Sequence, residues 1–231
     1  KVCKQLRHLF PKVVSYNRIV ELERGVIIPL TLFIKKILLD KCMGISFVDS
    51  TPLRVWKNQR IHIHKVFKGI AQRGKCSMGW FFGFKLHLIC NEKGELLNFM
   101  ITPGDIDDRK PLEYKAFIEF IQGRLFGDKG YISKNLFQRL FVDGIQLITK
   151  LKSNMKGALM SVSDRLLLRK RAIIETVNDE LKNIAQVEHS RHRCFDNFIV
   201  NLLGAIAAYC LFPKKPCINV QRTIDTQLAL F

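Results

Sequence analysis

The order of strand-like and helix-like segments is the feature of this chain that most constrains its fold. From residue 17 to residue 40 apolar side chains recur at helical intervals, and Pro29 is expected to divide or kink this helix. At Gly44 the pattern changes to short apolar runs, and strands are predicted over 44–49, 82–89 and 96–102. Strands and helices then alternate. This order predicts an α/β protein, a mixed sheet flanked by helices, with an N-terminal helical segment.

The alternating part of the chain is predicted from caps, turns and periodicity. Ser133 is expected to cap a helix that runs to Phe141. Asp107 or Asp108 is interpreted as the N-cap of a helical run that reaches Ile121, in preference to a metal site. The other predicted strands and helices are 125–128, 144–149, 163–186 and 197–211. Residues 54–75 are interpreted as a polar, basic stretch between the first two strands.

The charge of the chain favours a polyanionic partner. It has 38 Lys and Arg against 20 Asp and Glu, a formal net charge of +18. Nucleic acid is favoured over a merely solvated basic surface and over an anionic membrane, because Lys and Arg neutralise phosphates. No run of about 18 apolar residues lacks charges, so no membrane span is expected. The seven cysteines include no C-x-x-C pair, which argues against a zinc ribbon or disulfide framework and favours a reducing, cytoplasmic setting.

Two aspartates follow apolar strands directly. Asp49 ends the run from Ile45 to Val48, and Asp128 stands in the same relation to Leu125 and Phe126. Burying a charge there is costly unless it is paired or binds a metal. On neighbouring strands the two carboxylates could share a divalent ion. Either aspartate, considered alone, is better explained by the alternative, in which it caps a turn.

A third acid lies on a predicted helix. At 100° per residue Arg171, Glu175, Asn178 and Lys182 share a stripe about 60° wide, whereas Ile174, Val177 and Leu181 lie to one side of it. The helix is therefore expected to bury its apolar side and to present the polar stripe beside it. The alternative is that Glu175 is a surface residue paired with Arg171 one turn away.

Together these residues resemble the DDE transposases of bacterial insertion sequences. The matching motifs are Asp49 in FVDSTPL, Asp128 in FGDKGY, and Arg171-x3-Glu175-x6-Lys182. The last fits the family signature Tyr-x2-Arg-x3-Glu-x6-Lys, except that Leu168 stands in the tyrosine position. The resemblance covers about residues 45–211 and includes the segment 83–87 and the turn at 103–104.

The resemblance implies a ribonuclease-H-like fold and a transposase that cuts the ends of its element and joins them to target DNA. It implies two Mg²⁺ ions, replaceable by Mn²⁺, held by Asp49, Asp128 and Glu175. The partners would be double-stranded DNA, as terminal inverted repeats and target, and a second copy of the chain in a homodimer. The setting would be the bacterial cytoplasm, on nucleoid DNA. Residues 1–43 are interpreted as the end of a DNA-binding region and 44–231 as the catalytic domain.

The residues expected to contact DNA are Arg171, Lys182, Lys129, Asn178, His62, His64 and Arg60. The pair His62 and His64 could instead bind a metal, but no further ligand is close in sequence. Trp80, Phe81 and Phe82 could stack on a base, and core packing is favoured. Two other functions stay open: a catalytically inactive, transposase-derived DNA-binding protein, and a structure-specific nuclease that cannot join strands.

Overall fold

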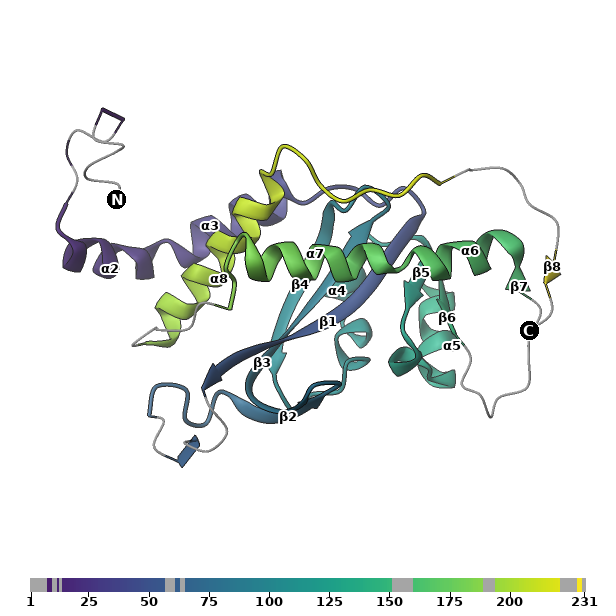
Figure 1. The fold of residues 1–231 in the computed structure, drawn as a ribbon, viewed down its shortest axis with the longest axis horizontal. Helices are drawn as coiled ribbons and strands as arrows, with labels where there is room; N and C mark the ends of the chain where they lie inside the picture. The colour runs from purple at the N-terminus through teal and green to yellow at the C-terminus, as the bar shows by residue number, and fades with distance from the viewer. Residues whose placement is uncertain are drawn as a thin grey trace.

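The computed structural model describes residues 8–9, 12, 14–56, 61–62, 65–150, 160–188, 194–220 and 228–229. Helices lie on both faces of a central sheet (Figure 1). The strands are β1 (Ile45–Trp56), β2 (Gln72–Cys76), β3 (Gly79–Asn91), β4 (Leu96–Pro103), β5 (Gly123–Gly127), β6 (Ile145–Thr149) and the small pair β7 (Met160–Ser161) and β8 (Leu228–Ala229). The α-helices are α2 (Tyr16–Gly25), α3 (Ile27–Phe33), α4 (Lys115–Ile118), α5 (Lys134–Val142), α6 (Val162–Lys170), α7 (Ala172–Asn183) and α8 (Phe195–Cys210).

The central sheet is mixed. Its order is β2-β3-β1-β5-β6, and β4 pairs with β3 as well. β1 runs antiparallel to β3 and parallel to β5, and β5 runs parallel to β6. The predicted α/β class with a mixed sheet is therefore confirmed.

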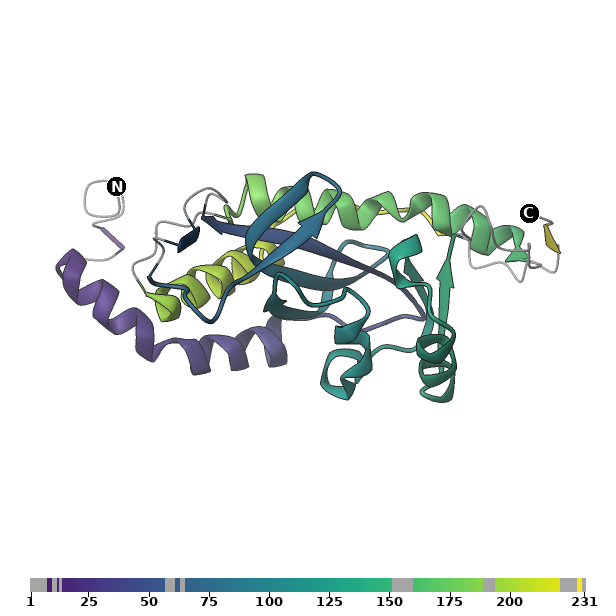
Figure 2. The same cartoon turned by 90° about the horizontal axis from the view of Figure 1, so that it is seen from below.

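The two faces of the sheet bury separate cores. One face carries Phe47, Leu88 and Phe126 and packs against α6, α7 and α8. The other carries Val48 and Leu125 and packs against α4, α5 and the 3-10 helices η3 (Lys110–Glu113) and η4 (Lys129–Tyr131). Figure 2 shows α7 on one side of the sheet and α5 on the other. Because side chains alternate along a strand, Asp49 shares the face of Phe47 and lies toward α7.

Several predicted bounds are wrong. β1 continues through Pro52 to Trp56, since this part of the strand pairs with β3 alone and a proline is tolerated where one edge has no partner. The basic stretch contains the strand β2, which its charges and glycine conceal. The single helix expected over 163–186 is divided at Arg171 into α6 and α7. The run up to Ile121 forms only the short helices η3 and α4.

Other local predictions are confirmed. Ser133 caps α5, and its hydroxyl accepts a hydrogen bond from the amide of Leu136. The N-terminal helical segment consists of α2, α3 and the π-helix η1 (Ile34–Leu38). Pro29 lies in the first turn of α3, where its missing amide hydrogen disrupts no helical bond. No helix among the described residues combines the length and the apolar character that crossing a membrane requires.

Candidate active site

Asp49 and Asp128 lie on neighbouring parallel strands. Their strands pair with Ile45 opposite Arg124 and Phe47 opposite Phe126. Continuing this register by two residues brings position 49 level with position 128. Directly opposed residues of paired strands share a face, so both carboxylates are directed to the side of the sheet that α7 covers.

Glu175 reaches the same side from α7. The apolar stripe of this helix, Ile174, Val177 and Leu181, is fully buried against the sheet. That packing fixes the rotation of α7, so the polar stripe predicted beside it faces the ends of β1 and β5. The side chains of Glu175 and Asp128 remain 58% and 55% exposed, which leaves both open to a ligand.

Arg171 joins two of the three acids. It lies at the break between α6 and α7, and its side chain is only 16% exposed. Its Nη2 atom is 2.7 Å from Glu175 Oε1 and 4.0 Å from Asp128 Oδ1. Both distances are measured from the same nitrogen. The two carboxylate oxygens can therefore be no farther apart than the sum of these two distances.

Asn178 holds the third acid. Its side chain lies one helical turn after Glu175, is 8% exposed, and donates from Nδ2 to Asp49 Oδ2 at 3.0 Å. The Asn178 Oδ1 atom is buried and accepts no hydrogen bond from the described residues. The predicted contact of Asn178 with DNA stays a prediction, and the contact that the structure gives it is with Asp49.

The acids interact electrostatically. Burial raises the pKa of Asp49 from 3.8 to about 6. Arg171 and the backbone amide of Ser50 act in the opposite direction, while the negative charges of Glu175 and Asp128 raise the pKa further. The structure therefore brings Asp49, Asp128, Glu175 and Arg171 together on one face of the sheet, where their charges influence one another.

A family model described as a transposase DDE domain matches residues 39–195. The chain belongs to this transposase family. No curated protein matches it significantly.

Two solved structures are similar to this transposase. The first is a cryo-EM structure of the piggyBac transposase synaptic complex with hairpin DNA, with a TM-score of 0.51 and 11% identity over 74% of this chain and 46% of that one. The second is a cryo-EM structure of the simian T-cell lymphotropic virus intasome in complex with PP2A regulatory subunit B56 gamma, with a TM-score of 0.38 and 12% identity over 84% of this chain and 64% of that one. The first likeness confirms the ribonuclease-H-like fold. The chain spans about half, 46%, of the piggyBac chain.

The donor set of the transposase site suits a hard divalent cation. Mg²⁺ prefers a few carboxylates together with water and phosphate oxygens. Three carboxylates stand here against one guanidinium, so a cation would compensate the remaining negative charge. Across the described residues, no group of three or more His, Cys, Asp or Glu is arranged to hold a metal ion. Instead Arg171 holds the Glu175 carboxylate. Asp49, Asp128 and Glu175 are carboxylates of the kind that Mg²⁺ prefers, and they lie on the same side of the sheet. They fit the metal once the ion pair between Arg171 and Glu175 opens.

The remaining predicted DNA contacts are dispersed. Lys129 is exposed on η4, directly after Asp128, and His62 is also exposed. Lys182 lies two turns beyond Glu175, with Nζ 3.6 Å from Glu188 Oε2. Arg60 and His64 lie outside the described residues. Sequence reasoning missed Glu188, which also accepts from the Arg54 backbone amide at 3.0 Å, and no local pattern could reveal a contact between such distant positions.

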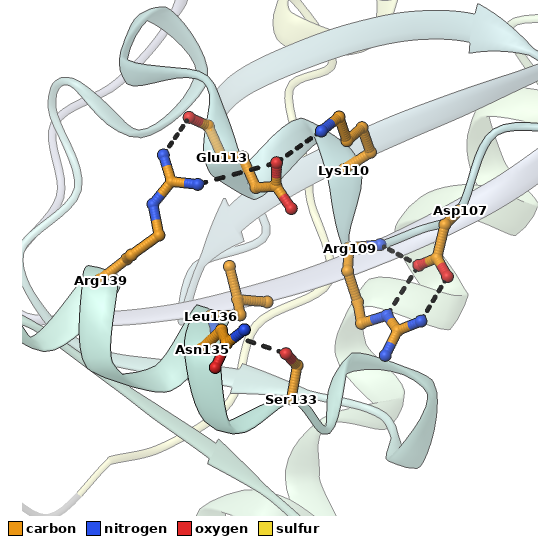
Figure 3. A pocket seen from close by; sticks show the side chains of 8 residues that line it. All are labelled: Asp107, Arg109, Lys110, Glu113, Ser133, Asn135, Leu136 and Arg139. Atoms are coloured by element: carbon orange, nitrogen blue, oxygen red, sulfur yellow. Dashed lines mark hydrogen bonds and ion pairs between the residues drawn. The ribbon is translucent and has the colours of Figure 1, made fainter.

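A second group of acids lines a separate cavity of about 450 Å³ beside α5 (Figure 3). Asp107 accepts hydrogen bonds from the backbone amide and the guanidinium of Arg109. Glu113 accepts from Lys110 at 2.6 Å and lies 3.7 Å from Arg139 Nη1. The predicted capping role is wrong, because η3 begins after Arg109 without a side-chain cap. Each of these two acids is neutralised by a cation of its own.

Proposed function

We propose that this transposase cleaves DNA at the ends of a bacterial insertion sequence and joins the freed ends to target DNA, with Mg²⁺ held by Asp49, Asp128 and Glu175. The observation that carries the proposal is the convergence of these acids, from β1, β5 and α7, around Arg171. The three acids occupy the positions of the family motif. The packing of β1, β5 and α7, which brings these acids to one side of the sheet, supports a shared site.

The reaction is phosphoryl transfer. In hydrolysis a water oxygen bonds to phosphorus, the bond to the 3′-oxygen breaks, and the element gains a 3′-hydroxyl. In strand transfer that hydroxyl attacks a target phosphate and releases another 3′-hydroxyl. When bound, two Mg²⁺ ions, or Mn²⁺ in their place, would stabilise the attacking and leaving oxygens.

The residues of the chain would orient the acids and the DNA. Asn178 fixes the Asp49 carboxylate through its amide, which keeps one carboxylate oxygen in a set direction. Arg171 neutralises Glu175 in this structure. A DNA phosphate entering the site would compete for the guanidinium, because charge-assisted bonds from arginine to phosphate are strong. Glu175 would then be free to turn toward the metal ions.

The proposed partners follow from this chemistry. Lys129, Lys182, His62, Arg60 and His64 would contact the phosphates of terminal inverted repeats and target DNA, and two copies of the chain would act together. The division into a DNA-binding end at 1–43 and a catalytic domain at 44–231 stays a prediction. So does the setting on nucleoid DNA in a bacterial cytoplasm.

One observation favours a second candidate, a catalytically inactive DNA-binding relative. Leu168 replaces the tyrosine of the family signature and is buried in the core at 4% exposure, so this position presents no hydroxyl to DNA. The two functions differ in their response to metal. An inactive relative would retain DNA and would show no carboxylate-dependent heat on titration with Mg²⁺ or Mn²⁺.

The deciding experiment uses duplexes made from the DNA that flanks the gene. With Mg²⁺ we expect 3′-hydroxyl ends at the element boundary and, from pre-cleaved ends, products joined to a target plasmid. Binding without cleavage or metal heat would support the inactive relative. Cleavage without joining of pre-cleaved ends would instead support a structure-specific nuclease.

A further inference from the structure

The segment that directly follows Asp49 is free of acids over its first 42 positions. Positions 50–91 contain eight Lys or Arg and no Asp or Glu. Among the described residues of this segment, five of these cations are exposed: Arg54, Lys65, Lys68, Arg73 and Lys75. The exception is Lys85, which pairs with Asp108 at 2.9 Å. So dense a positive charge favours contact with a polyanion.

The strand register gathers aromatic and cationic side chains on one face. Lys75 of β2 lies opposite Trp80 of β3, and Arg73 lies opposite Phe82. A register shift between Arg54 and Trp56 brings Trp56, at the end of β1, opposite Phe82 as well. Directly opposed side chains share a face, so Arg73, Lys75, Trp80 and Trp56 form one surface, here called the tryptophan patch.

The tryptophan patch exposes both tryptophans of the chain. Trp56 is 43% and Trp80 is 53% exposed, although so large an apolar side chain is usually well buried. The core packing predicted for Trp80 is therefore wrong, whereas Phe81 and Phe82 are buried. The Arg73 guanidinium carbon lies 4.8 Å from the centre of the Trp80 ring, and Lys75 Nζ lies 5.9 Å from it. Two cations therefore lie within cation–π distance of the ring.

The opposite face of the hairpin is firmly anchored. Gly74 lies opposite Phe81, which is 1% exposed. A Cβ atom added at Gly74 would stand 2.0 Å from the backbone oxygen of Gly104, so only glycine permits this close approach. Because one face of the hairpin is packed in this way, the other presents its aromatic rings on a rigid support.

The tryptophan patch lies on the same side of the sheet as the candidate active site. Phe82 and Leu88 belong to the core cluster that α7 covers, and Leu88 lies opposite Asp49. Figure 2 shows the β2–β3 hairpin projecting toward the side of α7. Along β3, Phe82 lies six positions from Leu88, a span of about 20 Å at roughly 3.3 Å per residue. One DNA molecule could therefore reach both places.

We propose that the tryptophan patch binds DNA with unpaired bases, stacking them on Trp80 and Trp56 while Arg73 and Lys75 hold adjacent phosphates. The proposal rests on the proposed function for its ligand class. Alternation of aromatic rings and cations is the pattern of surfaces that bind single strands, because every base offers a π-face and every nucleotide a phosphate. The unpaired bases would lie roughly six nucleotides from the cleaved phosphate, at about 3.4 Å per nucleotide.

The test uses the intrinsic fluorescence of the full chain in EDTA. Both tryptophans belong to the patch, so base stacking should quench the emission directly. The probes are a 12-nucleotide oligothymidine, a blunt duplex of equal length and phosphatidylserine vesicles. We expect strong quenching and tighter binding with oligothymidine. Trp80→Ala should weaken that binding about 5- to 150-fold, as expected from roughly 1–3 kcal/mol of stacking per base, and Trp80→Phe should restore part of it.

Charge variants supply the second arm. Arg73→Ala and Lys75→Ala should each weaken the binding of oligothymidine. Each should also lower the slope of the binding constant against salt concentration by the equivalent of about one phosphate contact. The matched control is Lys134→Ala, an exposed lysine on α5 at the opposite face of the sheet, which should change neither quantity.

The proposal is overturned if oligothymidine leaves the emission unchanged, if Trp80→Ala binds it like the unmodified chain, or if only vesicles quench. A preference for the blunt duplex would also overturn it. Because EDTA prevents metal-dependent cleavage, these results are independent of the catalytic assay. Failure of the patch and failure of the proposed reaction can therefore be told apart.

Discussion

Two groups of acids in this molecule have opposite electrostatic states. In the cavity beside α5, hydrogen bonds from Arg109 lower the pKa of Asp107 from 3.8 to about 2. At the candidate active site, burial raises the pKa of Asp49 from 3.8 to about 6. The cavity pairs each acid with its own cation. At the site Glu175 and Asp128 share Arg171, whose charge also acts to lower the pKa of Asp49.

The difference indicates which acids need a ligand. A carboxylate that is already neutralised gains little from a metal ion. The ion pair between Asp107 and Arg109 therefore needs no further ligand. The site around Arg171 keeps uncompensated negative charge in a partly buried place, which costs stability unless a cation arrives. The contrast therefore separates acids that stabilise the fold from acids that we propose perform chemistry.

The largest expected effect compares Asp49→Asn with Asp107→Asn. The first should lower Mg²⁺-dependent cleavage by about 10³-fold or more, because an amide cannot replace a charged metal ligand. The second should leave cleavage within about 2-fold of the unmodified chain. Asp128→Asn and Glu175→Gln should behave like Asp49→Asn. Gel assays of end cleavage measure this, with DNA retention as the control for folding. Cleavage retained by any one of the three site variants would remove that residue from the site.

The contact between Asn178 and Asp49 sharpens the comparison. Asn178→Ala removes the amide that holds the carboxylate, and we expect a 10- to 100-fold loss of Mn²⁺ affinity, roughly the effect of losing a group that orients a metal ligand. Titration calorimetry with Mn²⁺ measures it. Asn183→Ala, an exposed asparagine at the end of the same helix, is the matched control. Equal affinities for the two variants would show that Asn178 has no positioning role.

Arg171→Ala should separate metal binding from catalysis. Removing the guanidinium frees Glu175 and takes one positive charge from the site, so Mg²⁺ affinity should rise about 3- to 10-fold, the effect of roughly 1 kcal/mol of Coulomb repulsion. Cleavage should nevertheless fall, because the contact with a DNA phosphate is lost. Calorimetry and the cleavage assay together test this. A parallel fall of both quantities would mean that Arg171 only stabilises the fold.

The parts of the site that sequence predicted are those encoded locally. Asp49 and Asp128 follow apolar strands, and the stripe of Arg171 and Glu175 follows from helical geometry. Each acid alone would favour a structural role, and only the three motifs together indicate a site. The register that brings positions 49 and 128 level is a product of strand pairing, and the sequence indicated only that it was possible.

The parts that escaped depend on distant partners. Pro52 indicates the end of a strand unless β3 is known to pair with it from one side. Trp80 belongs to an apolar run that predicts burial, but it is exposed in the part of β3 that pairs with β2 alone, beyond the end of β1. The bond from Asn178 to Asp49 joins residues 129 positions apart, which helical periodicity cannot reveal.

The smallest expected effect is on the stability of the metal-free chain. Folded Asp49 keeps its proton up to about pH 6, whereas the unfolded carboxyl releases it near 3.8, so the folded state binds more protons between these values. Stability should therefore fall as pH rises through this window, by about 1–3 kcal/mol. Asp107 behaves oppositely, because its lowered pKa stabilises the fold above pH 3.8 and that stability is lost toward pH 2. Its side chain is 52% exposed, so the effect should stay below about 1 kcal/mol.

Urea unfolding at pH 4.5 and pH 7, followed by circular dichroism, measures both effects. Asp49→Asn should be more stable than the unmodified chain at pH 7, and this advantage should shrink at pH 4.5, where the carboxyl regains its proton in the folded state. Asp107→Asn should be slightly less stable at pH 7, because the ion pair with Arg109 is lost. If both substitutions changed stability in the same direction at pH 7, the two groups of acids would not differ in the way proposed. The distinction between structural and reactive carboxylates would then rest on the cleavage data alone.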